Sequence, residues 1–150
     1  MNPMNQGAKG ENMDARHRTM LTLWAALLTS VGLYFFLTLM IERPASGNDN
    51  NDMLFWVFLA ASILPLLLSF VLKRKLLAQS VAEQRPHLVQ TAMLLAVALC
   101  EAVALFGLLV FFTTRTPFYY VFFIISALCI LLHLPRRDQL LAASYKGQGF

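Results

Sequence analysis

Long apolar stretches and short polar segments alternate along the chain. Four apolar stretches can be delimited: Met20–Ile41, Met53–Leu72, Leu88–Thr114 and Phe118–Leu134. Each is close to or longer than the roughly 17–20 residues that an α-helix needs to cross a hydrocarbon core about 30 Å thick. The pattern therefore predicts an all-α integral membrane protein with four transmembrane helices.

The polar segments divide the chain into successive parts. We expect a tail at 1–19, a first transmembrane hairpin at 20–73, a loop at 74–87, a second hairpin at 88–135 and a tail at 136–150. Composition agrees, because 58% of the residues are hydrophobic and 13% are charged, against roughly 45–50% and 25% in soluble domains. The first stretch is longer than the roughly 7–15 residues of a signal-peptide core, so we expect it to be retained.

Basic residues predict the orientation of the helices. If both termini are cytoplasmic, the inside segments hold Lys9, Arg16, Arg18, Lys73, Arg74, Lys75, Arg85, Arg136, Arg137 and Lys146, and the outside holds Arg43 and Arg115. This bias predicts an N-in/C-in, multi-pass protein of the bacterial inner membrane, with the polar loop 42–52 outside. The net charge of +4 follows from this orientation and from contact with membrane lipids, and gives no reason to expect nucleic acid.

An internal repeat favours two tandem hairpins. A shift of 72 residues places the first apolar stretch on the third, with Leu23 on Leu95, Leu27 on Leu99 and Arg43 on Arg115. A shift of 64 places "FWVFLAAS" of the second stretch on "YYVFFIIS" of the fourth. The first and third stretches should then run in the same direction, as in parallel transporter repeats.

Glu101 is the candidate functional residue. It lies 14 residues after His87 and 13 before Thr114, which at about 1.5 Å per residue places it near the bilayer midplane. An ionised carboxylate there is costly, so we expect Glu101 to be protonated or paired and turned away from lipid. Neighbouring small residues at Ala98, Ala102 and Ala104 should let another helix approach.

The repeat also suggests hydrogen-bond partners for this carboxyl group. Thr29 occupies the position in the first stretch that corresponds to Glu101, and Ser30 follows it. The first and third helices are therefore expected to pack together near the pseudo-two-fold axis. Four side chains are expected candidates as partners: Thr29, Ser30, Ser62 and Ser126.

The segment around Glu101 carries a family resemblance. The run "QRPHLVQTAMLLAVALCEAVALFGLLVFF" resembles the carboxylate-bearing helix of the proteolipid c subunit of rotary ATPases. That resemblance implies that Glu101 takes up and releases a proton or sodium ion. With "RTPFYY" before the fourth stretch and "LLHLPRRDQ" after it, the chain also resembles uncharacterised four-helix bacterial membrane proteins that share this segment, which implies a fold and no activity.

Three further residues invite a cofactor interpretation. His133 lies at the cytoplasmic end of the fourth stretch, where an interfacial role is favoured over ligation of a haem or pigment, because a lone histidine is a poor ligand signal. Cys100 and Cys129 lie inside apolar stretches without CxxC or Cys/His spacing. We expect these cysteines to be small apolar residues with neither a disulfide nor a metal site.

Two functions follow, and neither is enzymatic, because the sequence shows no nucleophile with a base, no phosphate loop and no metal cluster. The first is a non-catalytic accessory subunit of a larger energy-transducing complex, respiratory or photosynthetic, that contacts other integral membrane subunits, lipid or pigment. No cofactor is required by the sequence, although bound lipid or pigment is compatible with it. The alternative is a c-like ion-translocating proteolipid that uses Glu101.

Overall fold

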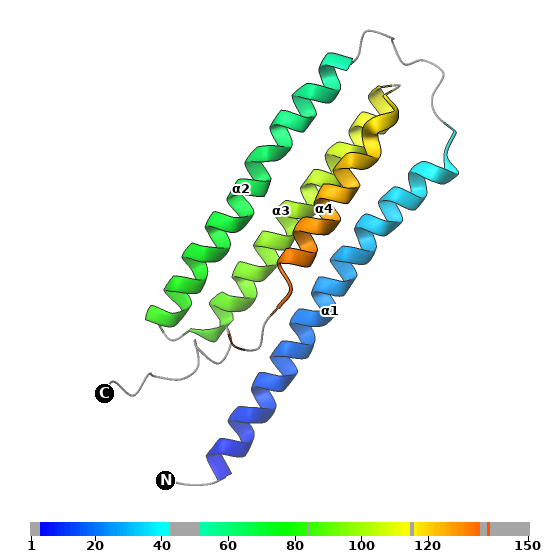
Figure 1. Cartoon of the computed structure of the whole chain (residues 1–150). Helices are drawn as coiled ribbons and strands as arrows, with labels where there is room; N and C mark the ends of the chain where they lie inside the picture. Colours follow the sequence, from blue (N-terminus) through cyan, green and yellow to red (C-terminus); the bar gives the residue numbers. More distant parts are fainter. Residues whose placement is uncertain (1–3, 43–51, 84, 115, 136–137, 139–150) are drawn as a thin grey trace.

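The computed structural model of the chain is all-helical and describes residues 4–42, 52–83, 85–114, 116–135 and 138 (Figure 1). Its elements are α1 (Met4–Met40), α2 (Asp52–Ala82), α3 (Pro86–Thr113), the short 3-10 helix η1 (Pro117–Tyr119) and α4 (Tyr120–Leu132). Most of the predicted outer loop 42–52, together with Arg115 and most of the tail after Pro135, lies outside the described residues.

Three helices are long and apolar enough to cross a membrane. The candidate spans are Asp14–Met40, Met53–Ala82 and His87–Thr113. A helix suits such sequences because it satisfies its own backbone hydrogen bonds where no water is available. The chain therefore has the helices of a multi-pass membrane protein.

The fourth stretch is shorter than predicted. Its α-helix has 13 residues, which corresponds to a length of about 20 Å, compared with a hydrocarbon core of about 30 Å. The chain nevertheless stays packed in the bundle after the helix ends, because His133 and Pro135 are both buried. Four helices are present in the described residues, and α4 is not among those long enough to span by itself.

Two segments that were predicted to be irregular are largely helical. α2 continues to Ala82 and α3 begins at Pro86, so most of the predicted loop 74–87 is helix, and a tight turn follows α2. α1 begins at Met4, within the predicted tail 1–19. Polarity marks where an apolar stretch ends, but a charged helix end can extend beyond it into water or headgroups, which explains the difference.

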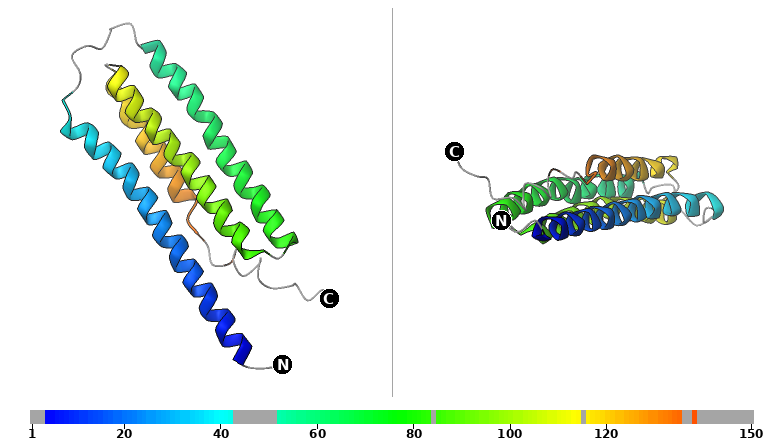
Figure 2. Two further views of the ribbon diagram at one scale, coloured as in Figure 1. Left: turned by 180° about the vertical axis from the view of Figure 1, so that it is seen from behind. Right: turned by 90° about the horizontal axis from the view of Figure 1, so that it is seen from below.

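α3 lies at the centre of the packing. It contacts α1, α2 and α4, whereas α1 packs chiefly against α3 and α4. Figures 1 and 2 show α1 and α2 on opposite sides of the pair formed by α3 and α4. The expected packing of the first helix on the third is confirmed, but this arrangement does not show two tandem hairpins.

The fraction of buried residues is also highest in α3. In the most apolar window of each span, 44% of the α3 residues are buried, against 11% for α1 and 17% for α2. The core is built mainly from α3 and α4, with buried side chains that include Val97, Val103, Phe122 and Ile130. α1 and α2 therefore leave most of their surface to lipid or to other proteins.

The prediction that Ala98, Ala102 and Ala104 form a contact face of the third helix is only partly correct. Ala104 is buried, Ala102 is half-buried, and Ala98 is exposed. In α1, Ala26 is exposed as well. The contact between α1 and α3 is therefore not built on Ala98 and Ala26, and a polar group lies there instead.

Candidate functional site

Glu101 joins α3 to α1 through two hydroxyl groups. Its Oε1 atom contacts Ser30 Oγ and lies 3.1 Å from the Tyr34 hydroxyl, which donates to it. Ser30 and Tyr34 are four residues apart, so they lie one above the other on the same face of α1. The Glu101 side chain is half-buried. Ser30, Tyr34 and Glu101 are together called the Glu101 cluster below.

The number of available protons favours a neutral carboxyl group in this cluster. Ser30 Oγ also lies 2.7 Å from the backbone carbonyl of Leu27, to which it donates. A serine hydroxyl has only one proton, so it cannot donate to Leu27 and to Glu101 at the same time. A protonated Glu101 satisfies every contact: Tyr34 donates to Glu101, Glu101 to Ser30, and Ser30 to the Leu27 carbonyl.

Of the four predicted partners, Ser30 is the one that contacts Glu101 in the described part of the chain. Thr29 is exposed and donates to the Ala25 carbonyl at 2.8 Å. Ser62 is buried and donates to the Leu59 carbonyl at 2.6 Å. Ser126 donates across the helix interface to the Cys100 carbonyl at 2.7 Å. The bonds of Thr29 and Ser62 lie within their own helices, as is common for serine and threonine, so these two hydroxyl groups are satisfied without a partner helix.

Tyr34 is the member of the Glu101 cluster that sequence reasoning missed. The repeat drew attention to Thr29, the aligned position, and not to the face of the first helix that would point at the third. A helical periodicity starting from Ser30 could have found Tyr34, because the two residues are one turn apart.

His133 is buried, which differs from the predicted interfacial role. It has 0% exposure and its ring lies 4.7 Å from that of Phe70 on α2. Its Nδ1 atom lies 2.8 Å from the Cys129 carbonyl and therefore carries a proton that it donates there. The Nε2 atom is buried and makes no hydrogen bond within the described residues. The short α4 explains the difference, since it ends against α2 inside the bundle.

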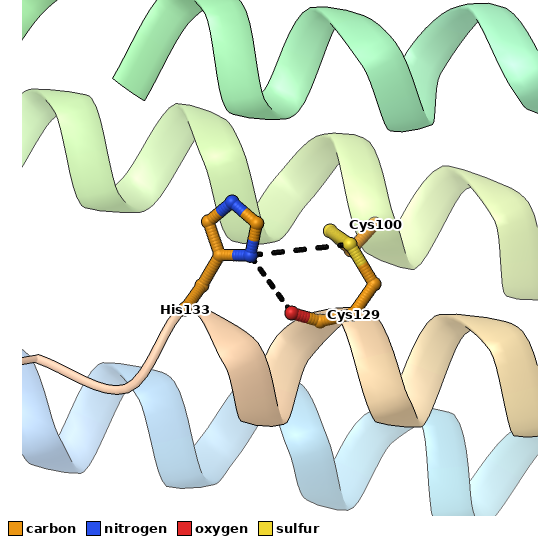
Figure 3. A group of neighbouring side chains, drawn as sticks. All are labelled: Cys100, Cys129 and His133. Atoms are coloured by element: carbon orange, nitrogen blue, oxygen red, sulfur yellow. Dashed lines mark hydrogen bonds between the residues drawn. A yellow bond between two sulfur atoms is a disulfide. The ribbon is translucent and has the colours of Figure 1, made fainter. Parts of the chain in front are cut away.

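Cys100 and Cys129 are joined in a disulfide, so the prediction that they are unpaired was wrong. Their Cα atoms lie 6.0 Å apart although 29 residues separate them in sequence. The prediction considered only cysteine spacing along the chain, whereas α3 and α4 are packed side by side and bring distant residues to the same level. Figure 3 shows that His133 adjoins this pair from α4, with Nδ1 3.9 Å from Cys129 Sγ.

The three side chains of this second site could also hold a metal ion. The sulfur atoms of the two cysteines and a ring nitrogen of His133 all lie within 4.8 Å of one another. The expectation that the chain has no metal site rested on the same linear spacing. Cys100, Cys129 and His133 are called the Cys–His cluster below.

The geometry therefore defines a helical, membrane-compatible protein with two internal sites, one between α1 and α3 and one between α3 and α4. Comparison of the chain with protein families, with curated proteins and with solved structures finds no match.

Proposed function

We propose that the protein is a non-catalytic accessory subunit of a larger energy-transducing complex, respiratory or photosynthetic, in the bacterial inner membrane. It contacts transmembrane helices of other subunits through α1 and surrounds itself elsewhere with lipid or pigment. The observation that carries this proposal is an exposed face of α1 on which small residues predominate.

That face lies opposite the side by which α1 is attached to the bundle. Thr22, Ala25, Thr29, Gly32 and Phe36 are exposed and recur every three or four residues, which places them on one side of the helix. A Cβ atom built on Gly32 would meet nothing within 4 Å among the described residues. Small residues let another transmembrane helix approach closely, because association in lipid depends on van der Waals packing. This set is called the open face of α1.

The Glu101 cluster supports the proposal by giving the carboxyl group a packing role. A neutral Glu101 accepts a hydrogen bond from Tyr34 and donates one to Ser30. Together these two bonds fix α1 against α3 in one orientation. The open face is then held pointing away from the bundle, towards a partner helix. In this role Glu101 needs no change of charge.

The partner proposal is tested by a pair of matched substitutions on exposed faces. Gly32→Leu fills the open face of α1, and Ala60→Leu places the same side chain at an exposed position of α2. Solubilised in a mild detergent and separated by native electrophoresis, the wild type and Ala60→Leu should migrate with partner subunits that Gly32→Leu has lost. Retained helicity and thermal stability would show that Gly32→Leu is folded. A wild type that migrates as a single chain would contradict the proposal.

The proposed topology has both termini in the cytoplasm, with four crossings. In its support, α4 runs towards the end of the bundle at which α1 begins, and α2 also ends there (Figure 1). The last third of α2 carries Lys73, Arg74 and Lys75. A reporter fused after Phe150 or inserted near Ala8 should be cytoplasmic, and one inserted at Asn48 should be outside. A C-terminal reporter outside the cell would instead show that the short α4 does not complete a crossing.

A second candidate function is ion translocation by Glu101, in the manner of the c subunit that this segment resembles. The specific observation in its favour is that Tyr34, Glu101, Ser30 and the Leu27 carbonyl form an unbroken chain of hydrogen bonds. An ion carrier must cycle between a charged and a neutral carboxyl group, whereas glutamine cannot ionise.

The two candidates are distinguished by one substitution and its control. Glu101→Gln should leave assembly and proton flux of the purified complex in vesicles unchanged if Glu101 only packs helices. Glu83→Gln, at an exposed acid beside the turn between α2 and α3, controls for loss of a carboxylate. Loss of flux in Glu101→Gln with normal assembly, and with Glu83→Gln unaffected, would favour the ion carrier and overturn the accessory role.

A further inference from the structure

The Cys–His cluster consists of three side chains that can each ligate a metal ion. Apolar side chains could pack α3 against α4 without them. His133 directly follows α4 and lies four residues after Cys129 of that helix, with Nδ1 3.9 Å from Cys129 Sγ. Cys100 meets them from α3 (Figure 3). All three residues are buried, with exposures of 0% for Cys100, 4% for Cys129 and 0% for His133. Nothing in the proposed accessory role uses this cluster.

Two sulfur atoms and one imidazole nitrogen form a soft donor set. Thiolate and imidazole ligands select thiophilic ions such as Zn²⁺ and Cu⁺ over the hard ions Mg²⁺ and Ca²⁺, which prefer oxygen. The mutual separations within 4.8 Å are compatible with one ion, because two ligands at about 2.0–2.3 Å from a metal lie at most about 4.6 Å apart and small side-chain movements cover the remainder.

We propose that the reduced form of the chain binds one thiophilic metal ion at Cys100, Cys129 and His133, and that the disulfide is the metal-free oxidised form of the same pair. Binding replaces the two thiol protons: two S–H groups and one M²⁺ ion give two S–M bonds and two released protons. The two forms exclude each other, since a sulfur in the disulfide has no thiolate to offer.

Charge favours Zn²⁺ as the ion. Two thiolates, a neutral imidazole and Zn²⁺ sum to zero, whereas Cu⁺ with the same ligands leaves one negative charge. A net charge is costly in an apolar interior, so the neutral complex is preferred between α3 and α4. Three protein ligands leave a fourth coordination position for water or another ligand, as in zinc sites that are not purely structural.

Ligation changes the tautomer of His133. In the disulfide form the Nδ1 proton of His133 is held by the Cys129 carbonyl, so ligation through Nδ1 moves that proton to Nε2. Ser69 Oγ lies 3.9 Å from Cys129 Sγ, but it donates its single proton to the Leu66 carbonyl at 2.7 Å and therefore donates none to the sulfur.

The test uses the full chain in detergent micelles. The disulfide is first reduced with a water-soluble phosphine, which takes up the oxygen of one water while the cysteines gain two hydrogens. After removal of the phosphine, the protein is titrated without oxygen with Zn²⁺ alone or with Cu⁺ alone, and bound metal is measured by mass spectrometry after desalting. Oxidised wild type is the folded control, because it has the same sequence without free thiols.

The expected result is one metal ion per reduced chain, with Zn²⁺ bound in preference to Cu⁺, and none on the oxidised chain. Cys100→Ser, Cys129→Ser and His133→Ala should each weaken binding by more than about 100-fold, beyond the effect typical of residues that only support a ligand. His87→Ala, at an exposed histidine, should bind like the wild type.

Three outcomes would overturn the proposal. In the first, the reduced wild type binds neither ion. In the second, binding persists in both cysteine variants. In the third, the oxidised chain binds as well as the reduced one, which would place the metal elsewhere on the molecule. The result is independent of the accessory role, because native electrophoresis of Gly32→Leu measures partner contacts and not metal content.

Discussion

Gly107 sets how closely α3 and α4 approach each other. A Cβ atom built at this position would lie 2.9 Å from Phe122 Cβ and 3.3 Å from two ring atoms of Phe123. The Phe123 ring can turn, but Phe122 Cβ is attached directly to the backbone of α4 and cannot. Gly107→Ala should therefore destabilise the protein by forcing the two helices apart.

The size of the effect follows from that geometry. Carbon atoms pack best at about 3.5–4.0 Å, so relieving the 2.9 Å contact requires a shift of roughly 0.6–1.1 Å. Overpacking of this kind typically costs about 1–3 kcal/mol. Alanine also favours the helix over glycine by about 0.8–1.0 kcal/mol, which offsets part of the loss. The net destabilisation of Gly107→Ala relative to the wild type is therefore about 0–2 kcal/mol.

Gly32 provides a matched control for the helix-propensity term. It too lies inside a membrane-spanning helix, but its added Cβ would meet nothing within 4 Å. Gly32→Ala should be as stable as the wild type or up to about 1 kcal/mol more stable. Because the propensity term is common to both substitutions, the difference between the two variants measures the overpacking alone, about 1–3 kcal/mol.

Unfolding of the two variants in mixed micelles with increasing dodecyl sulfate gives the comparison. Tryptophan fluorescence is a suitable signal once Trp56, the second of the two tryptophans, is replaced by Phe in both variants. The Trp24 Nε1 atom donates to the Ile130 carbonyl at 2.8 Å and so reports the contact of α1 with α4. Equal stabilities of Gly107→Ala and Gly32→Ala would refute the close approach of α3 and α4 at Gly107.

Three further substitutions test the polar contacts by the same unfolding measurement. Glu101→Gln keeps the shape and a donor, so it should cost only about 0.5–1.5 kcal/mol, and a much larger loss would argue against a neutral carboxyl group. Tyr34→Phe removes one hydroxyl and should also cost about 0.5–1.5 kcal/mol. Its effect should shrink in the Glu101→Gln background if the two side chains interact. Trp24→Phe removes the fluorescent probe, so its unfolding is followed by far-UV circular dichroism. It should cost a similar amount from the lost hydrogen bond, plus lost packing. The Ile130 carbonyl does not become unpaired, because it still accepts the backbone N–H of His133.

The sequence by itself determined the class of the protein. Apolar stretches of membrane-spanning length fold as helices, because a helix forms all of its backbone hydrogen bonds within itself where no water is available. The same reasoning located Glu101 in the middle of the third stretch and predicted that its carboxyl group is protonated or paired. Ser30 was among the predicted partners, because the internal repeat aligns its neighbour Thr29 with Glu101.

Only the tertiary structure decided which faces meet. Apolar side chains surround these helices on all sides, so periodicity carries little information about which face of a helix is lipid-exposed and which is buried. For that reason the exposed Ala98, the role of Tyr34 and the opposite positions of α1 and α2 could not be predicted. The cluster of Cys100, Cys129 and His133 could not be predicted for the same reason. Which side chains of two helices lie close together depends on the rotation and depth of one helix relative to the other, and residue spacing along the chain does not determine either.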